Sequence, residues 1–430
     1  MKPPACRTGR QRGAVIITVC LTLVFLLGFM GFALDLGRLF IVKHELQTAL
    51  DSCALAAAQE LDGQPTAIAR AVSAGQSAGN ANRVNLQSAN WDGKGQLTAA
   101  SFQFFDASLT PTTTPDLARY VECSHTQPAV RLWLLQAMNA FLGEAQAGPA
   151  TQNVGARAVA TRTSAQTTCP VPLMLRPKVT GAGAPDYGYT RGDWVKLLAD
   201  PAGATSNFVG WANLDGTSSA SSTESELLRG YCDVRLDVPL GTPGVQNAIA
   251  DAWNARFGIY RNQGSPSQPF MQPDMTGYAY STANWPSGRA AYDGPVPPGA
   301  HPTAANFETK RASFASCADT GTQVTGANSC STISQRPIGG GFNKLAEPGA
   351  GADGHWKYGV NKRLVIVPVS TTYPGKVEDY ACMLMLQPMT IPMTDVALEF
   401  IGNAGAIDSP CTTNGIPGGT AGPQVPVLVR

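Results

Sequence analysis

The sequence predicts an α+β protein in which one long helix precedes an antiparallel sheet and a loop-rich, mainly β region. Three observations lead to this fold class. After a short basic stretch, an uncharged apolar segment passes, without a proline, into an amphipathic one. Short runs rich in β-branched residues follow that rod. Only 14% of the 430 residues are charged, whereas glycine (45) and proline (32) are abundant, which is typical of a loop-rich β region.

Residues 13–34 are predicted to span a membrane. These 22 residues carry no charge, and as a helix they would be roughly 33 Å long, close to the roughly 30 Å of a hydrocarbon core. A cleaved signal peptide is the alternative, but Phe32-Ala33-Leu34-Asp35 is a poor cleavage site. We therefore expect a retained anchor, with Asp35 and Arg38 marking the membrane boundary.

The charges that flank this segment predict its orientation. Residues 1–12 contain Lys2, Arg7, Arg10 and Arg12 and no acidic residue, whereas the residues after the segment mix both signs. Positively charged flanks stay on the cytoplasmic side of a membrane. Residues 1–12 are therefore expected to be a cytoplasmic tail, with the bulk of the chain on the other side.

Beyond residue 34 the rod becomes amphipathic. Large apolar residues recur mostly at steps of three or four, as on one face of a helix, and a run of alanines adds helix propensity. This helix packing stripe is expected to lie on the chain's own sheet, or against a helix of another protein. Its larger members are Leu36, Leu39, Phe40, Leu46, Leu50 and Leu61.

Two domains are predicted after the membrane segment. Residues 35–165 are expected to form an α+β domain with a second helix from Thr66 to about Val84, and the proline-bearing stretch from Cys169 to Pro177 marks its end. Residues 166–430 are expected to be mainly β. The predicted strands are 96–105, 117–123, 130–135, 154–163, 364–369, 380–386, 396–402 and 425–429, and the predicted helices of the second domain are 224–230 and 245–260.

The ten cysteines suggest disulfides rather than a metal site. Seven of them lie beyond the opening helix, and none forms a CxxC pair. In an oxidising compartment they can pair, and Cys317 with Cys330 is the simplest local disulfide candidate. Because seven is odd, either Cys53 joins them or one thiol stays free; the alternative is that the thiols are buried as small apolar groups.

Charge and motifs narrow the classes of function. Thirty-one basic residues face thirty acidic ones, so the chain has no strong overall field to hold nucleic acid, and no nucleic-acid partner is expected. Four scattered histidines cannot make a zinc site. We therefore predict no cofactor and no metal, and the sequence identifies no small-molecule substrate.

Two motifs resemble parts of catalytic or metal sites. Residues 75–79, Gly-Gln-Ser-Ala-Gly, fit the GxSxG elbow of hydrolases with Ser77 as nucleophile, but no apolar strand precedes them. Asp106, Ser108 and Thr110 imitate a loop that holds a divalent cation in adhesion domains. The alternating strands and helices of such a domain do not follow them. A polar helix and an edge turn are the simpler interpretations.

A specific set of residues occupies the rod: Arg12-Gly13-Ala14, the run from Gly28 to Ala33, Asp35-x-Gly37-Arg38-Leu39, Glu45-Leu46-Gln47, and Asp51 leading to the alanine-rich end at Leu61. Over about 50 residues this pattern resembles the N-terminal region of TadG-like proteins of the Flp (tight adherence) pilus system. One position departs from the pilin pattern. A cut after Gly13 would require a glutamate where Thr18 stands, so pilin-type processing is not expected.

The resemblance implies a TadE/TadG-like, non-enzymatic component of Flp pilus assembly. It would be a single-pass inner-membrane protein with a cytoplasmic N-terminus, a pilin-like domain at residues 35–165 and a periplasmic bulk. Its partners would be the lipid bilayer and other pilus-assembly or pilin-like proteins, which it would contact through protein surfaces. The alternative hypotheses are a membrane-tethered hydrolase that uses Ser77 and a metal-dependent adhesin that uses Asp106, Ser108 and Thr110.

Overall fold

The architecture is α+β, and the chain divides into two compact units. In this computed structural model, unit 1 comprises Met1–Arg162 with Pro426–Arg430, and unit 2 comprises Thr163–Val425. A long apolar helix, several sheets and a mainly β second half confirm the predicted fold class. The residues that the structure describes are 12–133, 150–201, 203–242, 247–261, 264–320, 341–342, 344–350 and 354–429.

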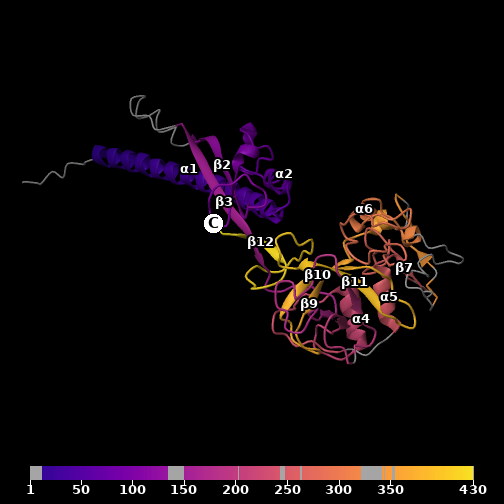
Figure 1. The fold of residues 1–430 in the computed structure, drawn as a ribbon. Coiled ribbons are helices and arrows are strands. Elements are labelled where there is room, and N and C mark those ends of the chain that lie inside the picture. The colour runs from indigo at the N-terminus through magenta and orange to yellow at the C-terminus, as the bar shows by residue number, and fades with distance from the viewer. Residues whose placement is uncertain are drawn as a thin grey trace, which may run out of the picture. The chain divides into compact units, whose positions relative to one another are not determined.

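Unit 1 is built on one helix of 48 residues, α1 (Arg12–Gln59). The first half of α1 carries exposed apolar side chains and projects beyond the sheet of unit 1 (Figure 1). A second helix, α2 (Ala67–Asn80), packs against the other half of α1. The buried face of α2 consists of small residues spaced four apart, which lets two helix backbones approach closely. These residues are Ala67, Ala71, Gly75 and Gly79.

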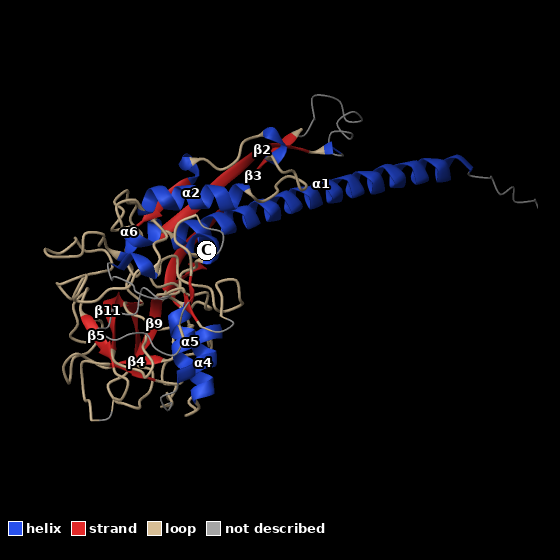
Figure 2. Cartoon of the chain, turned by 90° about the vertical axis from the view of Figure 1, so that its right-hand side faces the viewer, coloured by secondary structure: helices blue, strands red, loops and turns tan. Residues whose placement is uncertain are grey.

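The sheet of unit 1 has four strands in the order β1-β2-β3-β12, and β2 packs on α1 (Figure 2). β2 is antiparallel to both β1 and β3. β12 lies beside β3, although residues 165–423 separate them in the sequence. Two short 3-10 helices, η1 (Trp91–Gly93) and η2 (Ala99–Ser101), precede β1. The strands are β1 (Phe102–Phe105), β2 (Tyr120–Arg131), β3 (Thr151–Ser164) and β12 (Gln424–Leu428).

The single strand β2 takes the place of two predicted strands, 117–123 and 130–135. Its ladder with β3 continues on both sides of a register shift between Gln127 and Val130. Pro128 lies inside this bulge, where a residue without an N–H group does not interrupt the hydrogen-bonded ladder. Residues 134–135 lie outside the described residues.

Unit 2 contains a closed barrel of six strands in the order β10-β11-β5-β6-β4-β9. Most neighbours are antiparallel, whereas β4 is parallel to β9 and β5 to β6. Three of these strands are only three or four residues long and are absent from the predicted strands. The barrel strands are β4 (Leu173–Leu175), β5 (Trp194–Leu197), β6 (Val209–Trp211), β9 (Leu364–Val369), β10 (Asp379–Met385) and β11 (Val396–Asn403).

The core of unit 2 lies on both faces of the barrel wall. Every residue of β10 is buried. Met383 and Met385 belong to one apolar cluster, and Cys382 and Leu384 belong to another, as expected when successive side chains point to opposite faces of a strand. Further elements of the unit are α4 (Ala220–Arg229), α5 (Asn247–Ala255), β7 (Ile259–Tyr260), α6 (Phe307–Ala312), η4 (Cys317–Thr320), β8 (Lys344–Leu345) and α7 (His355–Tyr358).

Buried charged side chains hold the loops that cover the barrel. The Asp274 carboxylate accepts the backbone N–H groups of Thr276, Lys362 and Arg363 at 3.1, 2.9 and 2.9 Å. The buried Arg363 guanidinium in turn donates to the carbonyl oxygens of Thr276, Tyr278 and Met385. Such bonds replace the ladders that regular secondary structure would provide.

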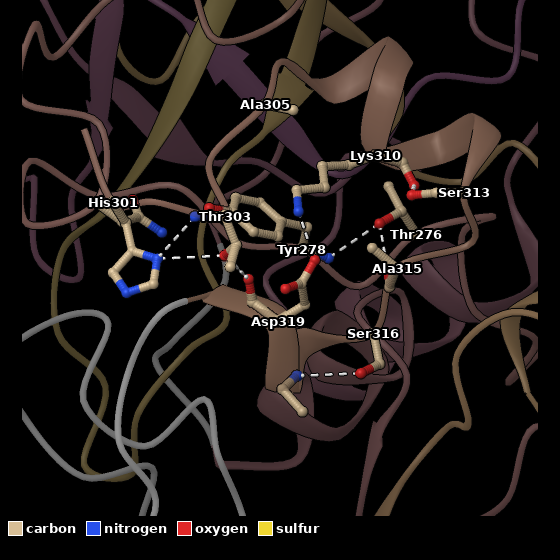
Figure 3. Close-up of polar contacts among 12 residues, drawn as sticks. Thr276, Tyr278, His301, Thr303, Ala305, Lys310, Ser313, Ala315, Ser316 and Asp319 are labelled. Atoms are coloured by element: carbon tan, nitrogen blue, oxygen red, sulfur yellow. Dashed lines mark hydrogen bonds and ion pairs between the residues drawn. The ribbon is translucent and has the colours of Figure 1, made fainter. Parts of the chain in front are cut away.

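The segment that contains α6 and η4 is fixed by similar contacts (Figure 3). The buried Lys310 ammonium pairs with Asp319 and lies 4.4 Å from the ring centroid of Tyr278. The hydroxyl of Thr303 donates to the carbonyl oxygen of Asp319 at 3.2 Å, and the backbone N–H of Thr303 donates to His301 Nδ1. Lys310 is therefore engaged in packing this segment.

Disulfides occur in both units. Cys53 pairs with Cys123 in unit 1, so the sequence alternative in which Cys53 joins the later cysteines is the one observed. Unit 2 contains Cys169–Cys232 and Cys382–Cys411. Cys317 is disulfide-bonded, but Cys330 lies outside the described residues, so their pairing stays a prediction.

Candidate membrane and assembly interface

The first half of α1 presents an apolar surface on all sides. Among the described residues, α1 is the one helix long and apolar enough to cross a membrane. Side chains between Val15 and Leu34 are almost all exposed, up to 72% for Phe25. Exposed apolar surface costs about 25 cal/mol per Å² in water, so a surface of this extent requires a bilayer or a partner to cover it.

Asp35 and Arg38, the predicted boundary residues, meet Trp133 at the end of this surface. The Asp35 carboxylate accepts the backbone N–H of Trp133 at 3.1 Å and is 3% exposed. The Arg38 guanidinium lies 4.4 Å from the centroid of the Trp133 ring. Sequence reasoning missed Trp133, because it lies 98 residues from Asp35 along the chain.

The helix packing stripe divides into a buried and an exposed part. Leu46, Leu50 and Leu61 are buried in the core of unit 1, while Leu39 is half-buried against Val42, Val130 and Val154. Leu36 and Phe40 are 40% and 66% exposed and do not join the buried part. Among the residues that the structure describes, the chain at this point covers the side of α1 that carries Asp35, Leu39 and Val42 and leaves Leu36, Phe40 and Ile41 exposed.

An open groove runs beside the exposed part of the stripe. It lies between α1 and β3, and the ammonium group of Lys43 crosses it to donate to the carbonyl oxygen of Gly155. This contact joins α1 to β3 at the point where the helix leaves the core of unit 1. The groove is lined by Leu36, Leu39, Phe40, Lys43, Asn153, Val154 and Gly155.

Polar residues of the rod position the rest of unit 1. The buried carboxylate of Glu45 accepts the backbone N–H groups of Leu86 and Gln87 at 2.8 and 3.1 Å and the side-chain amide of Gln87 at 2.9 Å. Asn85, Leu86 and Gln87 all have positive φ angles, between 60° and 66°, which non-glycine residues adopt only with support. Glu45 therefore holds a strained turn against α1.

Gln47 links the helix to the sheet. Its side-chain amide donates to Asp51 at 2.8 Å and to the carbonyl oxygen of Arg157 in β3 at 3.0 Å. The polar residues Glu45, Gln47 and Asp51, which lie between apolar positions of the rod, thus have identifiable structural roles.

The GxSxG sequence lies inside α2 and serves helix packing. A Cβ added at Gly75 would lie 2.5 Å from the Phe102 ring, and one at Gly79 would lie 2.4 Å from Leu97 and 3.3 Å from the carbonyl oxygen of Ala49 in α1. Ser77 faces solvent and donates to the carbonyl oxygen of Ser73 at 2.9 Å. A serine in this setting lacks the strained turn between strand and helix that a hydrolase elbow requires.

The residues of the metal-loop hypothesis form a closed turn after β1. The Asp106 carboxylate accepts the backbone N–H groups of Ser108 and Thr110 at 2.8 and 2.9 Å. This pattern is an Asx turn. Across the described parts of the chain, no group of three or more histidine, cysteine, aspartate or glutamate side chains could hold a metal ion.

The structure does not describe the side chains of the basic residues that predict orientation. Arg7 and Arg10 lie outside the described residues, and Arg12 begins α1 with a side chain that is not described. Orientation therefore stays a prediction from the sequence.

Comparison with known proteins places one family match on the helix. Residues 13–60 match the family model described as "Putative Flp pilus-assembly TadE/G-like". This confirms the resemblance carried by the rod, and the matched range coincides with α1 almost residue for residue. No curated protein and no solved structure matches the chain.

Proposed function

We propose that this chain, whose α1 carries a TadE/G-like region, is a membrane-anchored, non-enzymatic component of Flp pilus assembly that acts through protein–protein contacts. The family match supports involvement in Flp pilus assembly. The match coincides with a helix that is apolar and exposed in one half and buried on one face in the other. That coincidence is the observation that carries the proposal.

The arrangement of unit 1 suits an anchor that also serves as a scaffold. The first half of α1 would lie in the bilayer, and the second half forms the core of the head with α2 and the sheet. Leu46, Leu50 and Leu61 supply the apolar contacts, while Glu45 holds the turn at residues 85–87 and Gln47 bonds to β3. We propose that residues 35–165 act as a pilin-like assembly head and residues 166–430 as an outer domain.

The proposed location is the inner membrane, with the N-terminus in the cytoplasm and the bulk of the chain in the periplasm. The basic residues before α1 support this orientation. Disulfides persist in oxidising compartments, and those in both units support an exported bulk. A phosphatase fused after residue 430 should be active in the periplasm. Activity of a cytoplasmic reporter at that position, with none for the phosphatase, would contradict the orientation.

Complementation tests the function. Deletion of the gene from its native host should abolish surface Flp pili, and the full chain should restore them. Exchange of residues 13–60 for an unrelated helix with the same pattern of apolar and charged residues should not restore them, because the family-specific positions would be lost. A deletion strain that assembles the normal number of pili would refute the proposal.

Two variants test the non-enzymatic part of the proposal. Ser77→Ala and Asp106→Ala remove the groups on which the hydrolase and adhesin hypotheses depend. Both variants should restore pili as well as the unaltered chain does, because the structure gives these residues local hydrogen-bonding roles. Loss of pili in either variant, at normal protein levels, would favour the corresponding alternative.

A further inference from the structure

The exposed apolar surface of α1 continues beyond the predicted end of the membrane segment at residue 34. Leu36, Phe40 and Ile41 are 40%, 66% and 50% exposed. From Val15 to Ile41 the helix rises about 40 Å, which exceeds the roughly 30 Å of a hydrocarbon core and extends into the headgroup region. On its exposed side, α1 therefore stays apolar for about two turns beyond residue 34, where the uncharged segment ends.

The charges within these two turns are directed toward the protein. Asp35 is buried and hydrogen-bonded to the N–H of Trp133, and the Arg38 guanidinium stacks on the Trp133 ring. A hydrogen-bonded carboxylate and a stacked guanidinium are tolerated next to apolar surroundings far better than exposed charges are. The first exposed polar side chains of α1 after them are Lys43 and His44.

Trp133, which lies near the end of β2, contacts the same two turns of α1. It lies two residues after the end of β2 and is 62% exposed, although its backbone and ring are held by Asp35 and Arg38. Tryptophan is enriched at membrane–water interfaces, where one end of the ring is apolar and the other is hydrated. An exposed tryptophan fixed beside a membrane-spanning helix has the position that such an interface favours.

We propose that Leu36, Phe40, Ile41 and Trp133 form an interfacial belt that is immersed in the lipid headgroup region on the side of the head. The bilayer would then contact the end of β2 as well as α1. Lipid is the occupant that continuity favours, because the belt extends the apolar surface of Val15–Leu34 without a break. The proposal rests on the proposed function in so far as α1 spans the bilayer.

Fluorescence quenching by brominated phospholipids tests the belt. The full chain is reconstituted in vesicles of phosphatidylethanolamine and phosphatidylglycerol whose acyl chains carry bromine near the glycerol end. Part of the tryptophan emission should be quenched, and Trp133→Phe should remove that quenching. Trp356→Phe, which removes an exposed tryptophan in unit 2, is the matched control and should leave it unchanged. Equal quenching in the Trp133→Phe variant and the unaltered chain would overturn the proposal.

Two further reporters keep the outcomes separate. Phe40→Trp alters an exposed side chain and should add emission that is quenched at the same depth; if it is not quenched, the belt is refuted. Phe25→Trp should be quenched by bromine near the ends of the acyl chains. If Phe25→Trp is not quenched, α1 does not span the bilayer and the proposed anchor is refuted. If Phe25→Trp is quenched but neither Trp133 nor Phe40→Trp is, the anchor stands and only the belt is refuted.

A protein partner is the competing occupant. In that case Trp133 would be open to a water-soluble quencher in vesicles and shielded from it only in native envelopes that contain the pilus machinery. That result would assign the belt to an assembly partner and overturn its assignment to lipid.

Discussion

Cys53 on the buried face of α1 is bonded to Cys123 at the end of the β1–β2 pairing, so a covalent link joins the helix to the sheet it supports. The bond closes a loop of 70 residues that contains α2 and the turn at residues 85–87. The family-matched helix is thereby fixed to the head from inside its core, where both cysteines are buried.

Loss of this disulfide should destabilise unit 1. By the chain-entropy model a loop of this length contributes about 4 kcal/mol, so the Cys53→Ala/Cys123→Ala double variant should lose a free energy of unfolding of that order. Pulse proteolysis of the full chain in urea measures it. Cys382→Ala/Cys411→Ala, in unit 2, should leave the unfolding of unit 1 unchanged. A loss in unit 1 below about 1 kcal/mol would show that the entropic contribution is small.

Alanine at Gly79 should destabilise unit 1 more than alanine at Ser77. The added Cβ would overlap Leu97 and approach the carbonyl oxygen of Ala49, and overpacking of this kind costs about 1–3 kcal/mol. Ser77→Ala, on the exposed side of the same helix, should change the free energy of unfolding by no more than about 0.5 kcal/mol. Urea unfolding of the two variants gives the comparison, and equal stability would contradict the packing role of the glycine.

Removal of the Glu45 carboxylate should release the turn at residues 85–87. Glu45→Ala removes the acceptor of the N–H groups of Leu86 and Gln87, and each lost hydrogen bond should cost about 0.5–1.5 kcal/mol. Hydrogen exchange at these two amides should accelerate, and unit 1 should lose stability. Asp116→Ala, at an exposed carboxylate of the same unit, is the control. Unchanged exchange at both amides would show that the turn does not depend on Glu45.

Glu399 should make the stability of unit 2 depend on pH. Burial raises the pKa of Glu399 from 4.5 to about 7, although its carboxylate accepts N–H groups from Ala291, Tyr292 and Trp194. Because the folded state holds the proton more tightly, the contribution of this group to stability is complete below pH 4.5 and is lost as the pH rises through about 7. The loss should be about 3 kcal/mol.

Urea unfolding at several pH values measures this dependence. The free energy of unfolding of unit 2 should fall between the two pKa values in the unaltered chain and stay flatter in Glu399→Gln. Glu347→Gln, at an exposed glutamate of the same unit, should retain the slope of the unaltered chain. If Glu399→Gln retains it as well, the slope has another origin.

Long elements were predictable because their signal lies within the element itself. The 22 uncharged residues of the rod and the apolar run of β9 leave little choice of structure. β4, β5 and β6 are too short to show a period, and they become strands through distant partners, as in the pairing of Leu175 with Val369 and of Leu197 with Val209. Such pairings are a property of the closed barrel and not of any local stretch.

Some residues of the candidate interface could likewise be predicted from the sequence, and others could not. Asp35 and Arg38 could be named from the sequence because they follow directly on the apolar run. Trp133 could not, since its relation to them depends on where the β2–β3 pair meets α1. Leu36 and Phe40 fit the helical period, but the period does not reveal how far the sheet extends along the helix, and that extent decides which side chains are covered.

The position of β12 determines when the sheet of unit 1 can be completed. β12 completes the sheet of unit 1 beside β3, and the N–H of Val429 donates to the carbonyl oxygen of Val159 at 2.9 Å. Until residues 165–423 have been synthesised, that edge of the sheet has no neighbour, and an open edge is a template for pairing with other chains. The sheet that β1, β2 and β3 begin is thus completed only after the whole of the barrel has been made, and until then pairing between incomplete molecules competes with the addition of β12.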